Sequence, residues 1–142
     1  MPKQASGYGI SITVNLPFDR ALARTRDALA GEGFGILTEI DVTGTLRKKL
    51  DVEFRPYVIL GACNPPLAHR ALSAELDIGL LLPCNVIVYA ADNPDRTVVA
   101  ALDPVAALSL TDNDAVKPLA QEVRVKLQRA LESLSSAERK SA

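Results

Sequence analysis

The sequence is poor in reactive and metal-binding side chains. Its 142 residues include two cysteines, one histidine and no tryptophan, with three tyrosines and three phenylalanines. So few cysteines exclude a disulfide-rich scaffold and a zinc module built from several Cys ligands. Apolar residues make up 48% of the chain, which is enough to bury a core at this length. We expect a single domain over residues 1–142, with an ordered core over about 8–134 and a frayed polar tail over 135–142.

The sequence also lacks a large excess of positive or negative charge. Sixteen Lys and Arg stand against 17 Asp and Glu, which gives a net charge of -1. No overall positive field would attract nucleic acid or an anionic membrane, so neither is an expected partner. The charge is not uniform, because the stretch 61–111 holds two Arg against five Asp and Glu and is therefore net -3. A site in this stretch would therefore favour cations or neutral ligands.

Long hydrophobic runs are lacking as well. Residues 1–9 contain no apolar segment of the kind that a secretory signal requires. The longest apolar stretch, Ile78–Ala91, is interrupted by Pro83 and Asn85 and falls short of the roughly 18 residues that a membrane helix needs. We expect this stretch to be a buried strand. We also expect a cytoplasmic protein in which Cys63 and Cys84 remain thiols.

Hydrophobic periodicity changes along the chain between that of a strand and that of a helix. Residues 8–14 alternate with period two, whereas apolar residues after Pro17 recur at helical spacing until Gly31 or Gly33. Strands are expected at 8–14, 34–40, 57–63, 86–90 and 97–102, and helices at 18–29, 42–50, 65–72, 105–110 and 114–134. This order predicts an α+β fold, with a mainly antiparallel five-stranded sheet, two major helices on one face and additional short helices.

Four short blocks of sequence resemble a known family. They are Gly33-Phe34-Gly35-Ile36, Leu60–Ala68, Leu82–Val86 and Asp103-Pro104, in that order. Over residues 8–134 the chain resembles domain-of-unknown-function family 302. The resemblance implies a β-α-β(4)-α fold with a curved sheet of the TATA-binding-protein-like type, and a homodimer. It implies no activity, and a fold type shared with a DNA-binding protein does not carry that function.

The two cysteines occupy similar places in the predicted fold, because each is followed by an asparagine at the end of a strand. Cys63-Asn64 ends one strand and Cys84-Asn85 begins another, so antiparallel neighbouring strands would bring the thiols together. Cys63 also precedes a helix that Asn64 caps, and the helix dipole favours a thiolate there. Glu39 faces either solvent or a ligand pocket. The candidate ligand-binding residues are therefore Cys63, Asn64, Cys84, Asn85 and Glu39.

His69 is the single imidazole, and it lies on the helix that follows Cys63. Together with the thiolates of Cys63 and Cys84 it would offer a soft-metal ligand set for zinc or copper(I). The opposing interpretation makes His69 a helix-surface residue and the two cysteines small buried hydrophobes. Three soft ligands do not close a four-ligand zinc site without water, a carboxylate or the dimer partner. The sequence identifies no cofactor.

Several functions are compatible with this pattern. The leading hypothesis is a cytoplasmic, homodimeric module that binds a small ligand near the two Cys-Asn steps. A second is a thiol-dependent redox or sulfur-transfer protein. A third is a soft-metal-binding or purely structural protein that acts through its interactions. Whether the protein is an enzyme is left open, because no Ser-His-Asp order, phosphate loop or dinucleotide fingerprint is present.

Overall fold

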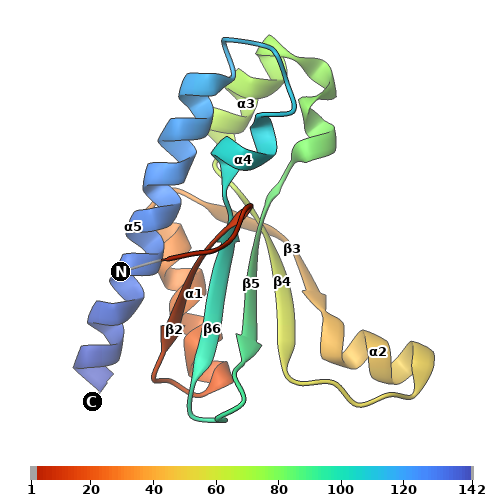
Figure 1. Cartoon of the computed structure of the whole chain (residues 1–142), viewed down its shortest axis with the longest axis vertical. Helices are drawn as coiled ribbons and strands as arrows, with labels where there is room; N and C mark the ends of the chain where they lie inside the picture. The colour runs from red at the N-terminus through yellow and green to blue at the C-terminus, as the bar shows by residue number, and fades with distance from the viewer. Residues whose placement is uncertain (1–2, 142) are drawn as a thin grey trace.

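The fold is built on one antiparallel sheet, and the computed structural model describes residues 3–141, with side chains over residues 7–135. The six strands are β1 (Lys3–Ser6), β2 (Gly9–Val14), β3 (Gly35–Asp41), β4 (Tyr57–Cys63), β5 (Cys84–Ala90) and β6 (Thr97–Leu102). Their order is β1-β2-β6-β5-β4-β3, and all neighbouring pairs are antiparallel (Figure 1). The predicted α+β fold with antiparallel strands is confirmed. Strand β1 is an addition at the edge, and its small and polar residues show no hydrophobic alternation.

Two long helices form the second layer. The helices are α1 (Phe18–Gly31), α2 (Val42–Leu50), α3 (Pro65–Ala74), α4 (Pro104–Leu108) and α5 (Lys117–Ser141), with a 3-10 helix, η1 (Leu76–Leu81). Helices α1 and α5 pack against each other and cover one face of the sheet, as predicted (Figure 1). Pro118 falls in the first turn of α5, where its missing N–H has no helical partner to lose.

Two hydrophobic clusters form the interior. The main core lies between the sheet and the two long helices, and it includes Val14, Leu29, Leu60, Val86, Val88, Val99, Leu127 and Leu131. The second core lies among α3, η1, α4 and α5, and it includes Leu67, Ala71, Ile78, Leu108, Val116, Leu119 and Ala120. Val123 of α5 packs against both clusters. The end of the sheet near α3 is therefore a junction between two separately packed regions.

The turn from α1 into β3 shows how local chemistry sets the direction of the chain. Gly33 has φ of 85°, a left-handed conformation that favours glycine. The N–H of Gly33 donates to the carbonyl of Ala30, and the N–H of Phe34 donates to that of Leu29. These two bonds form a Schellman motif, which satisfies carbonyls at the helix end. Gly33, one of the two predicted stop residues, thus ends α1 and turns the chain toward β3, which begins at Gly35.

Two segments differ from the sequence prediction. Ile78–Ala91 is not one buried strand, because η1 occupies Leu76–Leu81 and β5 begins only at Cys84. Helical spacing buries Ile78 in the second core and leaves Leu76 and Leu80 exposed, so the apolar run does not indicate a strand. Helix α5 continues to Ser141, past the expected end at residue 134. Ala, Glu, Arg and Lys in this tail have good helix propensity, which offsets its polarity.

Helix α2 projects away from the rest of the molecule (Figure 1). The Asp41 side chain caps it by accepting from the N–H of Gly44 at 3.0 Å, and it ends at Asp51 in the left-handed region. None of its nine residues, all of which the structure describes, is buried. Within residues 3–141, no helix combines the length and the hydropathy that crossing a bilayer requires.

Candidate functional site

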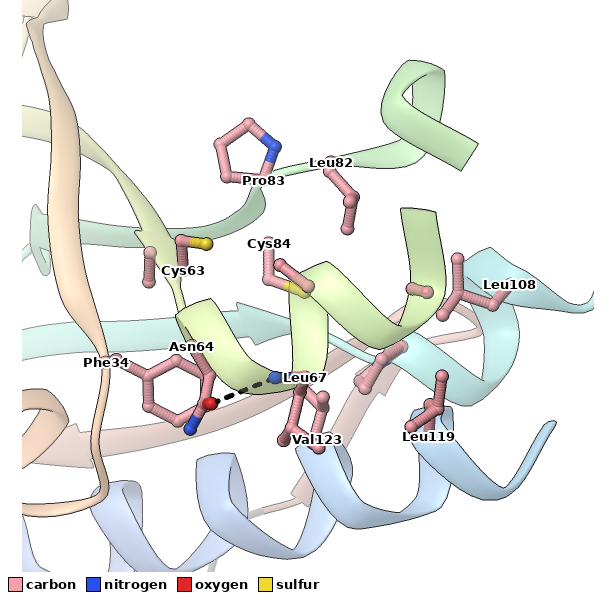
Figure 2. Close-up of a pocket in the computed structure, with 14 residues that line it drawn as sticks. Phe34, Cys63, Asn64, Leu67, Leu82, Pro83, Cys84, Leu108, Leu119 and Val123 are labelled. Atoms are coloured by element: carbon pink, nitrogen blue, oxygen red, sulfur yellow. Dashed lines mark hydrogen bonds between the residues drawn. The ribbon is translucent and has the colours of Figure 1, made fainter. Parts of the chain in front are cut away.

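A pocket lies at the junction of the two cores, where β4 ends and β5 begins (Figure 2). Its walls come from the last residues of β4, from the residues at the start of β5, and from α3, α4 and α5. The lining residues are Phe34, Ala62, Cys63, Asn64, Leu67, Ala68, Ala71, Leu82, Pro83, Cys84, Pro104, Leu108, Leu119 and Val123. Three of the five candidate residues therefore line one pocket. None of the 14 lining side chains carries a formal charge.

Strand pairing brings the two cysteines to the same end of the sheet. Strands β4 and β5 are antiparallel neighbours, and Ala62 lies directly opposite Cys84. The antiparallel pairing on which this prediction depends is thus confirmed, and both cysteines lie at one end of the sheet. Their sulfur atoms point in different directions (Figure 2), so the approach of the thiols themselves stays a prediction. Both cysteines are free; Cys84 is buried with 8% of its surface exposed, whereas Cys63 is partly exposed. In Figure 2 the Cys84 side chain points toward α3.

Asn64 holds the start of α3 at the mouth of the pocket. Its side-chain Oδ1 accepts from the N–H of Leu67 at 3.4 Å, while Pro65 and Pro66 occupy helix positions that need no N–H (Figure 2). The predicted capping role of Asn64 is confirmed. The same amide lines the pocket, so its remaining hydrogen-bonding capacity is available beside the thiols.

Burial sets the protonation of the thiols. It raises the pKa of Cys63, and it raises the pKa of Cys84 to about 11, with a smaller contribution from the neighbouring charge of Cys63. The expectation that the helix dipole makes Cys63 a thiolate is therefore wrong. The first-turn N–H of Leu67 already has Asn64 as its acceptor, and loss of hydration disfavours the charged thiol. At neutral pH both groups are neutral, weakly polar thiols.

The remaining candidate residues lie outside this pocket. Asn85 follows Cys84 on β5, and because successive strand residues face opposite sides, it lines a groove on the other face of the sheet. Glu39 is exposed and forms an ion pair with Arg26 of α1. Of the two predicted alternatives, solvent or a ligand pocket, Glu39 therefore faces solvent at the sheet edge, where its carboxylate pairs with α1.

The predicted metal set is not assembled. His69 is exposed on α3, whereas Cys84 is buried. In the part of the chain that the structure describes, no three His, Cys, Asp or Glu side chains are grouped to hold a metal ion. The prediction that His69, Cys63 and Cys84 form a soft-metal site is therefore wrong for the described residues. Helical geometry turns His69 outward, while Leu67 and Ala71 face the interior.

The apolar walls of the pocket were not predicted as site residues. Leu119 and Val123 come from α5, more than 30 residues beyond Cys84 in the chain, and Phe34 comes from the start of β3. On α5, Leu119 and Val123 lie four residues apart and therefore on the same face of the helix. Asp103 caps α4: its Oδ1 accepts from the N–H of Val105 at 2.9 Å, and its Oδ2 lies 3.4 Å from Arg124 Nε. This buried carboxylate therefore has a structural role beneath α4.

The sheet, the two covering helices and the junction pocket define a two-layer α+β protein with an apolar internal site. The chain belongs to the family described as domain of unknown function DUF302, whose family model matches residues 10–134. It is also similar to a crystal structure of an uncharacterized conserved DUF302 protein from Bacillus stearothermophilus, with a TM-score of 0.81 and 29% identity. That match covers 89% of this chain and 98% of the other. No curated protein matches the chain.

Proposed function

We propose that this protein is a cytoplasmic, homodimeric module that binds a small uncharged ligand in the pocket at Cys63, Asn64 and Cys84. One observation carries the proposal: an apolar pocket lies between two packed cores and presents only thiols and one amide as polar side chains. A ligand site of this type uses apolar walls for affinity and a few polar groups for orientation. The raised thiol pKa values disfavour the thiolate chemistry that a redox or sulfur-transfer protein needs.

The free space in the pocket limits the ligand. It amounts to about 40 Å³, a few times the roughly 10–15 Å³ that a cavity needs to hold one water molecule. A complete drug-sized molecule needs about 300 Å³ or more. The occupant is therefore a small neutral molecule or the terminal carbons of an alkyl chain. A carboxylate or phosphate placed there would lose its hydration with no cation in the lining to offset the loss.

Methyl and amide NMR spectra recorded during titration with 1-butanol would test this proposal. We expect saturable shifts at Leu67, Leu119 and the Cys84 amide. The Ala68→Leu variant, which fills the pocket from α3, should lose these shifts. The Ala74→Leu variant adds the same side chain at an exposed position of the same helix and should keep them.

Two outcomes contradict the proposed site. One is a linear, unsaturable shift spread over the whole surface, which indicates a solvent effect of the alcohol. The other is an Ala68→Leu variant that keeps the saturable shifts at Leu67 and Leu119, which shows that the alcohol binds elsewhere. A well-dispersed spectrum of each variant establishes that it is folded before the titration begins.

A further inference from the structure

The face of the sheet opposite α1 and α5 carries a shallow groove of about 420 Å³. Its lining includes Tyr8, Tyr57, Tyr89, Ile87 and Val98 from four different segments. Because side chains alternate along each strand, the neighbouring residues Val58, Val86, Val88 and Val99 are buried in the main core on the other side. The groove is therefore a second side-chain layer of the same strands, and it lacks the helical cover of the first.

Strand register arranges this face in two rows that run across the sheet. One row contains Ile40, Ile59, Ile87, Ala100 and Ser11, each opposite the next on a neighbouring strand. The second row contains Tyr57, Tyr89, Val98 and Thr13 in the same way. These nine positions carry no charge. An antiparallel sheet that faces water normally places polar and charged residues on its outer side, so this composition is that of an interface.

Aromatic rings continue the second row toward the projecting helix. Tyr57 and Tyr89 stack with ring centroids 5.3 Å apart and planes inclined by 6°. The ring centroids of Phe54 and Tyr57 are 6.1 Å apart, with the ring planes tilted against each other, and Phe54 is 45% exposed. Burial, followed by the nearby charges of Tyr89 and Tyr8, raises the pKa of Tyr57. Phe54, Tyr57 and Tyr89 thus form a continuous aromatic surface at this end of the face.

Helix α2 adds a second surface that the rest of the chain covers only in part. Its first turn is tied to the start of β4, because Thr43 Oγ1 donates to the carbonyl of Arg55 and accepts from the N–H of Tyr57. Val42, Leu46 and Leu50 recur every four residues and form its apolar stripe, yet none of them is buried. Isolated helices shorter than about 12–15 residues are marginal in water, because most helical stability comes from packing an apolar face. A nine-residue helix that projects from the body in this way therefore needs a partner against its stripe.

The size of the combined surface matches a dimer contact. Five strands spaced about 4.8 Å apart and two rows spaced about 7 Å apart project about 300 Å². Helix α2 and the exposed residues Leu50, Val52 and Phe54 extend this to about 550 Å² in projection. Protruding side chains increase the accessible area above the projected area. The accessible area of this surface therefore exceeds the few hundred Å² of contiguous apolar surface that monomers usually expose. It approaches the roughly 800 Å² that each partner buries in a stable complex.

We infer that a second copy of this chain covers the open sheet face, and that α2 of each copy packs along the edge of its partner. Two uncharged faces meet without repulsion, and a twofold axis makes one such face complementary to itself. Sheet-on-sheet packing at about 10 Å would then bury both rows. A charged partner would leave its own charges unpaired against this surface. The inference rests on the homodimer included in the proposed function and assigns the surface that forms it.

Sedimentation velocity over a range of protein concentrations tests the assignment. The wild-type chain is expected to sediment at about twice its 15.2 kDa mass. Ile87→Glu places a charge at the centre of the face and should raise the dissociation constant at least 100-fold. Leu110→Glu introduces the same charge at a position that is 78% exposed and lies after α4, outside the face, so it should leave the dimer intact.

A second variant keeps the test decisive if Ile87→Glu does not fold. Phe54→Glu changes an exposed residue and should weaken the dimer while leaving the monomer folded, as circular dichroism would show. Amide exchange in α2 should also accelerate when the protein is diluted. A wild-type monomer at millimolar concentration, or a dimer that Ile87→Glu and Phe54→Glu leave intact, overturns the inference. Butanol shifts at Leu67 and Leu119 that persist in a monomeric Phe54→Glu variant separate the dimer surface from the ligand pocket.

Discussion

The pH dependence of stability at Cys84 is the sharpest physical prediction for the site. The ordinary pKa of the thiol is 9.0, and burial raises it in the folded protein to about 11. The folded state therefore holds the proton more tightly than the unfolded state. This contribution is fully present below pH 9 and is lost as the pH rises through 11. Each pKa unit corresponds to about 1.4 kcal/mol, so the ionisation of Cys84 should remove about 2 kcal/mol of stability between pH 8 and pH 11.

Urea unfolding at several pH values between 8 and 11, with a reductant present, measures this effect. Lysines and tyrosines also titrate in this range, so the relevant quantity is the difference between the wild type and Cys84→Ala. The variant loses side-chain packing at every pH, but its free energy of unfolding should fall less steeply above pH 9. We expect the two curves to converge by about 2 kcal/mol. Cys63→Ala should keep most of the wild-type slope, because burial is the largest cause of the Cys84 shift.

Parallel curves for the wild type and Cys84→Ala would refute the reasoning, because they would show that Cys84 has the same pKa in both states. Rapid alkylation of Cys84 at pH 7 would refute it independently, since a buried neutral thiol is a poor nucleophile. Cys63, which is more exposed, should react first with a neutral alkylating reagent.

Two substitutions test the packing around the pocket. Gly61→Ala places a Cβ 2.2 Å from Thr38 Oγ1 and 3.0 Å from Pro83 Cγ, so it should lower the urea unfolding free energy by about 1–3 kcal/mol. Adding Thr38→Ala should restore part of this loss, and an unchanged loss would mean that the Thr38 contact is not its cause. Asn64→Ala removes the cap on the N–H of Leu67, and urea titration should show a loss of about 1 kcal/mol. Replacement by Asp, which also caps, should recover most of it; equal losses in both variants would contradict the capping role.

Much of the fold followed from short-range patterns. Alternation over residues 8–14 matches β2, and the glycine and asparagine signals at Gly33 and Asn64 end α1 and start α3 where the structure has these boundaries. The prediction failed at Ile78, where an apolar run belongs to a 3-10 helix and not to a strand. Length and hydrophobicity do not separate these two states over so few residues. Strand β1 gave no signal, because its residues are polar or small.

Part of the candidate site was also accessible from the sequence. Antiparallel pairing of the strands that end at Cys63 and begin at Cys84 places both cysteines at one end of the sheet, as the predicted topology implied. Asn85 was predicted to share a site with Cys84 because the two are adjacent in the sequence. Successive residues of a strand face opposite sides, so Asn85 lies on the other face of the sheet. The protonation of Cys84 depends on how many atoms exclude water from it. That number comes from helices far away in the chain.

Most helices and strands of this protein follow from local patterns, because helix spacing, strand alternation and caps are properties of neighbouring residues. The sequence also determined that thiols, and not charges, occupy the end of the central strands. Three features appear only when the chain is folded: Leu119 and Val123 of α5 line the pocket, His69 is exposed while Cys84 is buried, and within residues 3–141 neither α1 nor α5 covers one face of the sheet. These properties depend on the relative positions of residues far apart in the chain, which packing of the whole domain sets.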